Sequence, residues 1–185
     1  PSIDPAKMSL QLMWPAVATI NVLESFDVHA GLKWPNDILI AGRKIGGILA
    51  ESSSAKMSIK MIVGIGLNVH QKIADFPEDI SEKAGSIFSQ TKKKLDADEL
   101  LSALVDQLNI AYSQLKTGNE SFVHQKWLEN CCHLNKLVTV ITENDTKQGL
   151  FLGIDENGFA LIENYTGIHR IISFKNFLLK EDLCC

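Results

Sequence analysis

The stretch KWPNDILIAGRKIGGILAE, residues 33–51, decides how the fold of this sequence is predicted. Its apolar runs at 38–40 and 44–51 are separated by Ala-Gly-Arg, which is typical of a hairpin turn between two strands. A further strand over 31–34 ends at the Pro-Asn-Asp turn. SIKMIVGIG, residues 58–66, reads as another strand. Strands that follow one another so closely predict a central sheet with at least one antiparallel pair.

Three charged residues lie close together around this hairpin. Lys33 and Lys44 are on neighbouring strands, where they could point to one face and form a positive pocket for a carboxylate or phosphate. Asp37 lies in the turn and could hold a Mg²⁺ carried by a nucleotide, because hard cations prefer carboxylate and phosphate oxygens. The residues themselves leave open the alternative that both lysines are simply solvated. Trp34 is expected in the core.

Glycines inside strands suggest that something approaches the backbone closely. Gly46, Gly47, Gly64 and Gly66 all lie within predicted strands, where glycine weakens a strand unless a ligand or another backbone comes near. A β-bulge is the alternative explanation. Asn68 follows the strand that ends at Gly66, and its side chain offers both a donor and an acceptor.

Helical periodicity appears before and after these strands. Residues 5–26 predict a helix with Asp4 as its N-cap, kinked at Pro15; a helix that begins near Pro15 is the alternative. Residues 81–88 predict a short helix. Residues 96–115 predict a long one capped by Asp96, and residues 121–131 predict a further helix.

Near residue 135 the pattern changes from helical to alternating. Residues 137–141, 148–154, 159–162 and 169–172 read as short strands separated by Asn-, Asp- and Gly-rich turns. The predicted class is therefore α+β, with a mixed central sheet and flanking helices in residues 1–134. A small β-barrel is predicted over residues 135–185.

Composition excludes several functional classes. The 185-residue chain is 45% hydrophobic with a net charge of -4, which is typical of a soluble globular protein and not of a dedicated nucleic-acid binder. No apolar run reaches the roughly 20 residues of a membrane span, so a cytoplasmic location is expected. The cysteines form two adjacent pairs, and Cys131, Cys132 and His133 lack a fourth ligand for zinc.

Three motifs, in this order and spacing, resemble the biotin protein ligase family: KWPND at 33–37, RKIGGIL at 43–49 and GIGLNV at 64–69. The resemblance implies a catalytic domain related to class II synthetases and a small SH3-like barrel. It also implies that biotin and ATP form biotinyl-5′-AMP and pyrophosphate, with Mg²⁺ as cofactor. The biotinyl group then passes to a lysine of a biotin carboxyl carrier domain.

The resemblance also implies roles for individual residues. Lys44 would lie beside the biotin carboxylate and the adenylate phosphate, Asp37 would help to place Mg²⁺, and Asn68 would contact the adenosine. Lys33 and Asn36 would organise the turn or touch phosphate. The residues implied to lie against biotin or the adenylate are Gly47, Leu49, Gly64 and Gly66. The three glycines would let the bicyclic ring of biotin approach the protein backbone.

One part of the family pattern has no counterpart. The family's glycine- and arginine-rich loop precedes KWPND, and nothing in residues 1–32 matches it. The chain is therefore expected to be N-terminally incomplete and to have low or no ligase activity by itself. The DNA-binding extension of some members is also unmatched, so no DNA partner is expected, and a homodimer is left open. The alternatives are a non-catalytic binding or dimerisation module and, more weakly, a lipoate ligase.

Overall fold

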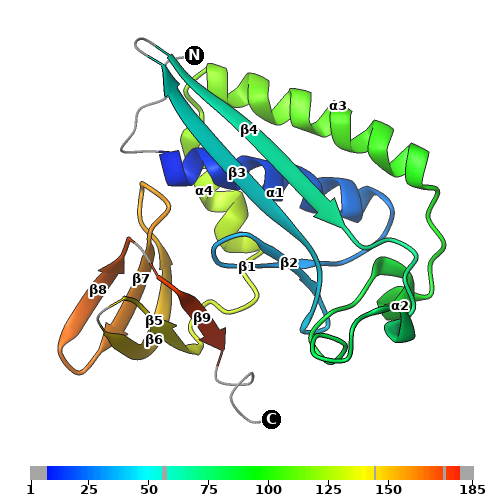
Figure 1. Cartoon of the computed structure of the whole chain (residues 1–185). Coiled ribbons are helices and arrows are strands. Elements are labelled where there is room, and N and C mark those ends of the chain that lie inside the picture. Colours follow the sequence, from blue (N-terminus) through cyan, green and yellow to red (C-terminus); the bar gives the residue numbers. More distant parts are fainter. Residues whose placement is uncertain (1–7, 56–57, 144, 173, 180–185) are drawn as a thin grey trace.

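The computed structural model describes residues 8–55, 58–143, 145–172 and 174–179 (Figure 1). The helices among them are α1 (Met8–Ser25), α2 (Ile87–Thr91), α3 (Ala97–Lys116) and α4 (Glu120–Glu129). The first group of strands is β1 (Gly31–Lys33), β2 (Asp37–Ile40), β3 (Arg43–Ala55) and β4 (Ser58–Leu67). The second is β5 (Leu137–Ile141), β6 (Thr146–Ile154), β7 (Ala160–Asn164), β8 (Gly167–Ile171) and β9 (Asn176–Leu179).

The first four strands form one sheet in the order β1-β2-β3-β4, and each named pairing is antiparallel. The predicted hairpin turn is confirmed: Ala41 and Gly42 both have positive φ, as a type I′ turn requires. A register shift follows, because Ile38 pairs with Gly46 but Leu39 pairs with Lys44. Among the described residues, parallel pairing is limited to two isolated bridges, Leu32 with Cys131 and Lys44 with Ala84. The mixed sheet expected from the sequence is thus an antiparallel sheet with two parallel bridges.

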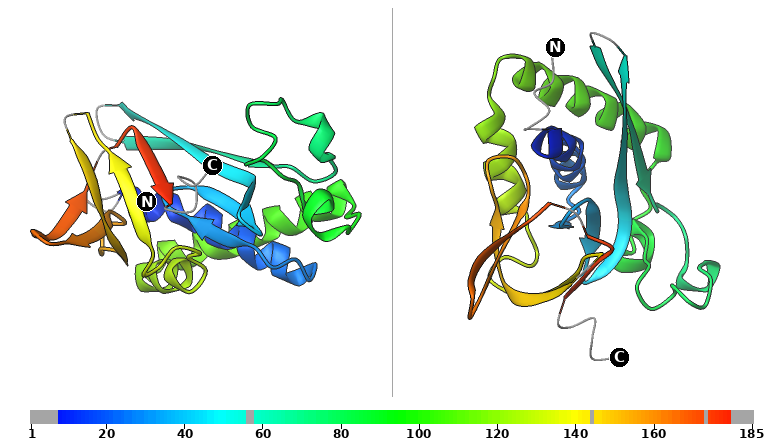
Figure 2. Two further views of the ribbon diagram at one scale, coloured as in Figure 1. Left: turned by 90° about the horizontal axis from the view of Figure 1, so that it is seen from below. Right: turned by 60° about the vertical axis from the view of Figure 1, so that its left-hand side comes forward.

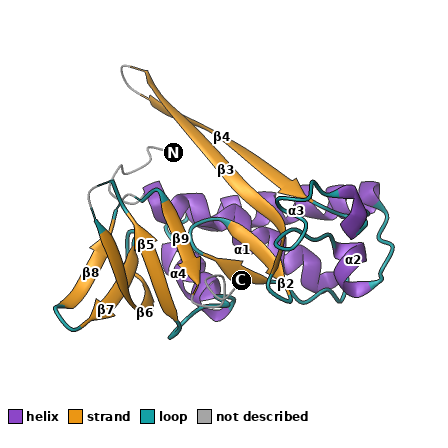
Figure 3. Ribbon diagram, turned by 60° about the horizontal axis from the view of Figure 1, so that its bottom comes forward, coloured by secondary structure: helices purple, strands orange, loops and turns teal. Residues whose placement is uncertain are grey.

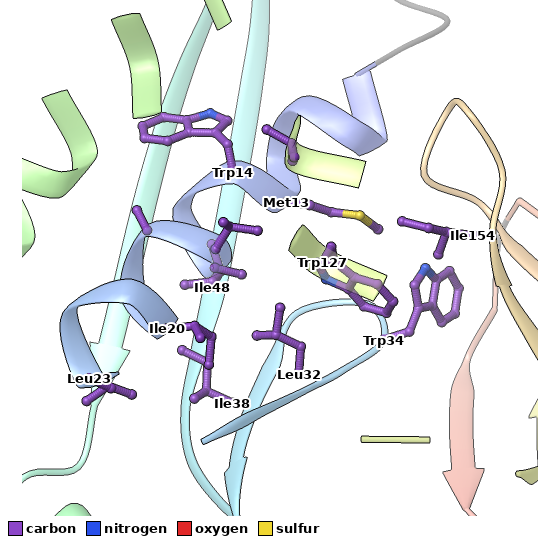
Figure 4. Packing of buried hydrophobic residues seen from close by; sticks show 14 of the residues in the cluster. Met13, Trp14, Ile20, Leu23, Leu32, Trp34, Ile38, Ile48, Trp127 and Ile154 are labelled. Atoms are coloured by element: carbon purple, nitrogen blue, oxygen red, sulfur yellow. The ribbon is translucent and has the colours of Figure 1, made fainter. Parts of the chain in front are cut away.

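Helices cover one face of this sheet (Figure 2, right). The predicted first helix is confirmed as α1, which continues through Pro15, while Asp4 and Pro5 lie outside the described residues. Fully buried α1 residues such as Val17 and Ile20 pack in one cluster with Ile38 and Ile48 of the sheet (Figure 4). Burying these side chains removes roughly 1.5–3 kcal/mol each of unfavourable hydration, which holds α1 against the sheet.

The prediction of a short helix over residues 81–88 is wrong. The helix found there is α2, which begins only after Ser86, whose hydroxyl accepts from the Ser89 amide. The preceding residues bond to β3 instead: the Lys44 amide donates to the Lys83 carbonyl at 2.7 Å, and the Gly85 amide donates to the Lys44 carbonyl at 2.9 Å. Backbone groups used across to a strand are not available for helical hydrogen bonds. In contrast, α3 is confirmed, with Asp96 accepting from two amides of its first turn.

The last five strands form a second antiparallel sheet in the order β8-β7-β6-β5-β9, lying beside α4 (Figure 3). The four predicted strands are present, and β9 is an additional one. Trp34 joins the two parts of the molecule: its ring lies 4.6 Å from that of Phe174 and 5.3 Å from that of Phe177, and its Nε1 donates to the Gly158 carbonyl. Trp34 is 4% exposed, so its predicted core position is confirmed. The domain boundary at 134/135 stays a prediction.

No helix in the described part of the chain is long and apolar enough to cross a membrane.

His133 is fully buried where the second sheet meets the rest of the molecule. Its ring lies 4.2 Å from Phe151 and 5.2 Å from Phe177. Burial, with the nearby charges of Lys33 and Lys136 as smaller causes, lowers the pKa of His133 to about 3. Burial also raises the pKa of the neighbouring Cys131 thiol to about 12, so that thiol is protonated at neutral pH.

The depressed His133 pKa predicts acid sensitivity. Between the unfolded-state value of 6.5 and the folded value of about 3, the unfolded chain binds more protons, so stability falls as the pH falls. From pH 6.5 to pH 5 this amounts to about 2 kcal/mol of unfolding free energy. Urea denaturation should show the extra loss in the wild type and a smaller loss in His133→Gln. Equal losses in both proteins would contradict the assignment.

Candidate functional site

The face of the β3–β4 hairpin opposite the helices is largely open. Directly paired residues of antiparallel strands share a face, and here Gly47 pairs with Gly66 and Leu49 pairs with Gly64. Leu49 is 64% exposed, whereas the next residue back, Ile48, is 3% exposed and points into the core. Four of the predicted site residues therefore lie on one open sheet surface, which we call the glycine face (Gly47, Leu49, Gly64 and Gly66).

The four glycines of β3 and β4 differ in what a side chain at each position would meet. A side chain at Gly64 or Gly66 would meet no protein atom nearer than 3.7 Å, so their absent side chains leave open space above the sheet. At Gly47 the Cβ would lie 3.3 Å from Cε and 3.4 Å from Nζ of Lys44, so this glycine makes room for the lysine. At Gly46 the Cβ would lie 2.5 Å from the Gly66 carbonyl oxygen, so this glycine is required by the strand pairing itself.

Lys44 lies at the end of the glycine face and forms an ion pair. Its Nζ is 2.5 Å from Asp37 Oδ1, and the side chains are 51% and 25% exposed. Strand β2 supplies the carboxylate and strand β3 the ammonium, so the hairpin itself brings the two predicted catalytic residues together. A partly exposed pair of this kind contributes little to stability. It does hold the lysine chain across Gly47, next to the open face.

An open pocket of about 630 Å³ adjoins Lys44. One wall comes from the sheet and includes Lys44, Gly47, Gly66 and Asn68. The other wall comes from the chain between β4 and α2; we call its residues 76–84 the pocket loop, and Phe76, Ile80, Lys83 and Ala84 line the pocket. Sequence reasoning missed this loop. The apolar residues Phe76 and Ile80, which recur four positions apart in a largely polar stretch, are the signal that could have marked it.

Arg43 and Asn68 hold the loop in place. Arg43 Nη1 donates to the carbonyls of Ser81 at 2.6 Å and Ala84 at 3.1 Å. Asn68 Nδ2 donates to the Gly85 carbonyl at 2.9 Å, and its backbone carbonyl accepts from the Ile87 amide. Asn68 therefore lines the pocket and also positions the chain that faces it, while its contact with adenosine stays a prediction.

The other predicted residues lie beside the pocket. Asn36 donates from its side chain to the Ile48 carbonyl, and its own carbonyl accepts from the Ile48 amide at 2.9 Å, so it organises the turn. Lys33 pairs in register with Asp37, yet it does not line the pocket and its charge acts on His133. Asn36 and Leu49 line a second pocket of about 240 Å³, whose aromatic lining residues are Trp34, Phe159 and Phe174.

Two family descriptions match separate parts of the chain. Residues 1–68 match the Biotin/lipoate A/B protein ligase family, and residues 133–178 match the Biotin protein ligase C terminal domain. The second description names biotin protein ligases alone, and together the two matches cover more than half of the chain. This chain belongs to the biotin protein ligase family.

Individual members of the biotin protein ligase family support the assignment. The Bifunctional ligase/repressor BirA of Bacillus spizizenii is 30% identical over 175 residues, which are 94% of this chain and 54% of that protein. The Biotin--[acetyl-CoA-carboxylase] ligase of Paracoccus denitrificans is 30% identical over 142 residues, 74% of this chain and 58% of that one. The chain thus spans little more than half the length of these curated relatives.

Solved structures of the family agree with the fold described above. The apo biotin protein ligase of Aquifex aeolicus superimposes with a TM-score of 0.81 at 27% identity, covering 94% of this chain and 76% of that chain. The Aquifex enzyme in complex with biotin and ATP superimposes with a TM-score of 0.77 at 29% identity, covering 91% of this chain and 71% of that chain. The agreement includes both sheets, because the overlap extends over nearly all of this chain.

Proposed function

We propose that this chain carries the sheet, the pocket and the C-terminal domain of a biotin protein ligase, which activates biotin with ATP and transfers it to a lysine of a biotin carboxyl carrier domain. The observation that carries the proposal is the position of Lys44, which lines the pocket and whose ammonium lies beside Gly47 of the glycine face. A carboxylate of a ligand on that face and a phosphate of a ligand in that pocket would both be within its reach. The Aquifex relative has been solved with biotin and ATP.

The reaction is an acyl activation in which an oxygen of the biotin carboxylate attacks the α-phosphorus of ATP. The bond from that phosphorus to the bridging oxygen breaks, and pyrophosphate leaves with the electron pair. Lys44 offsets the negative charge that builds where the two anions meet, in a site held rigid by β3. The open backbone at Gly64 and Gly66 would let the bicyclic ring of biotin approach the sheet.

Mg²⁺ fits this site as a companion of the nucleotide. The described residues contain no cluster of three or more His, Cys, Asp or Glu side chains that would hold a metal by themselves. A single carboxylate, Asp37, beside a phosphate pocket matches the usual Mg²⁺ environment of one or two carboxylates completed by phosphates and water. When bound there, Mg²⁺ would neutralise phosphate charge, and Asp37 would move from Lys44 toward the metal. We place the reaction in the cytoplasm.

The direct test is an assay of biotin transfer. This chain is incubated with biotin, ATP and Mg²⁺, with a biotin carboxyl carrier domain as acceptor, and biotinylated acceptor is measured alongside biotinyl-5′-AMP. The acceptor with its target lysine changed to arginine is the control for transfer, and lipoate in place of biotin is the control for substrate class. Binding of neither biotin nor ATP would refute the proposal. Any measurable adenylate formation that Lys44→Ala abolishes would count against the non-catalytic module.

Arg43 should affect the nucleotide more than biotin. Arg43→Ala removes two hydrogen bonds that hold the pocket loop but touches no residue of the glycine face. Loss of such charge-assisted bonds is expected to raise the KM for ATP about 5- to 10-fold while the KM for biotin changes less than about twofold. Hydrogen exchange of amides 80–85 should accelerate in the same variant. Equal changes in both KM values would contradict a positioning role.

A further inference from the structure

Charge in the pocket is supplied by two lysines from distant parts of the sequence. Lys44 comes from β3 and Lys83 from the pocket loop, and no described carboxylate lines the pocket with them. The backbone fixes their proximity, since the Lys44 amide donates to the Lys83 carbonyl at 2.7 Å. The parallel bridge between Lys44 and Ala84 extends the same contact.

The two lysines differ in what surrounds their ammonium groups. Lys44 is paired with Asp37 at 2.5 Å, so much of its charge is balanced before any ligand binds. Within the described residues, the Lys83 ammonium has no hydrogen-bond or ion-pair partner, and the residue is exposed at the pocket wall. Arg43, which holds the pocket loop, directs its Nη1 at backbone carbonyls. Lys83 is therefore the cation in this pocket that remains uncompensated.

We infer that Lys83 binds the β- and γ-phosphates of the nucleotide and receives the leaving pyrophosphate. This inference rests on the proposed function. A nucleoside triphosphate carries several negative charges, and Lys44 together with one Mg²⁺ beside Asp37 would balance them only in part. As the bond from the α-phosphorus breaks, charge moves onto the pyrophosphate, away from Lys44. A flexible ammonium on the opposite wall is suited to follow it, because lysine binds phosphate as a mobile point charge.

The test compares three anions on the same protein. Affinities for ATP with Mg²⁺, for pyrophosphate and for AMP are measured by calorimetry on the wild-type chain and on Lys83→Ala, Lys83→Arg and Lys72→Ala. Lys72 is the matched control, because it is an exposed lysine on the same connection that does not line the pocket. Biotin binding is measured in every variant as a check on the glycine face.

Lys83→Ala is expected to weaken ATP and pyrophosphate about 5- to 10-fold and to leave AMP and biotin within about twofold. Lys83→Arg should retain most of the affinity, and Lys72→Ala should resemble the wild type. A higher salt concentration should reduce the difference in ATP and pyrophosphate affinity between the wild type and Lys83→Ala, because salt screens an exposed contact between an ammonium and a phosphate. Equal weakening of ATP and AMP, no weakening, or the same loss in Lys72→Ala would overturn the inference. A wild-type chain that binds neither biotin nor ATP would instead refute the proposed function.

Discussion

Lys44→Ala is expected to slow formation of biotinyl-5′-AMP by about 100- to 1000-fold. The estimate is the usual effect of removing one preorganised electrostatic group from the position where charge develops. The structure supports an effect of this size because the Lys44 ammonium is held by Asp37 across Gly47, between the two places where the reacting anions would lie. Single-turnover adenylate formation is the appropriate measurement, since it isolates the first step.

Two controls separate chemistry from folding and from the loss of the ion pair. The rate of biotin transfer from added biotinyl-5′-AMP to the carrier domain should fall less than about tenfold. In that reactant the bond between the biotin carboxylate and the α-phosphorus is already formed. The double variant Lys44→Ala with Asp37→Asn removes the unpaired carboxylate and should remain as slow as the single variant. Thermal stability should change little, as expected for a partly exposed pair. Unchanged adenylate formation would show that the role given to Lys44 is wrong.

Gly66→Val is expected to abolish most biotin binding without unfolding the protein. The new Cβ would have the Gly47 carbonyl oxygen at 3.9 Å as its nearest neighbour, which is ordinary contact, and valine is favoured in strands. The side chain would rise from the glycine face into the space we assign to the ligand. Overlap of this kind costs about 1–3 kcal/mol, so we expect affinity to fall about 10- to 100-fold in calorimetry with biotin.

Gly46→Ala provides the matched contrast. Its Cβ would lie 2.5 Å from the Gly66 carbonyl oxygen, so β3 and β4 would have to move apart. We expect this variant to lose about 1–3 kcal/mol of unfolding free energy in urea denaturation. If Gly66→Val were as destabilised as Gly46→Ala, or bound biotin normally, the glycine face would not be the ligand surface.

The sequence correctly predicted the elements that are marked by local residues, such as a helix N-cap or a turn glycine. Asp96 before a run of helical period correctly placed the start of α3, and the glycine-containing turn at 41–42 correctly placed the β2–β3 hairpin. The prediction failed where tertiary bonds compete with local propensity. Residues 83–85 bond to β3 and therefore do not continue the predicted helix. The last strand, β9, was missed because its four residues form a strand only by pairing with β5.

The candidate site was predictable in part. The motifs identified Lys44 and Asp37, and the hairpin alone is enough to bring these two side chains together. Motifs did not distinguish the glycines, however, because each one looks alike in sequence. Only the register shows that Gly46 is needed by the strand pairing, that Gly47 accommodates Lys44, and that Gly64 and Gly66 are open.

The sequence by itself determined the family, the α3 helix and the hairpin with its paired charges. The helix and the hairpin each depend on a short continuous stretch of chain, and the family is marked by motifs that all lie between residues 33 and 69. Only the tertiary structure decided which cations meet in the pocket. Lys44 and Lys83 belong to segments some 40 residues apart, and backbone hydrogen bonds between β3 and the pocket loop bring them together. Such bonds form between groups that every residue carries, so no residue type marks them in the sequence.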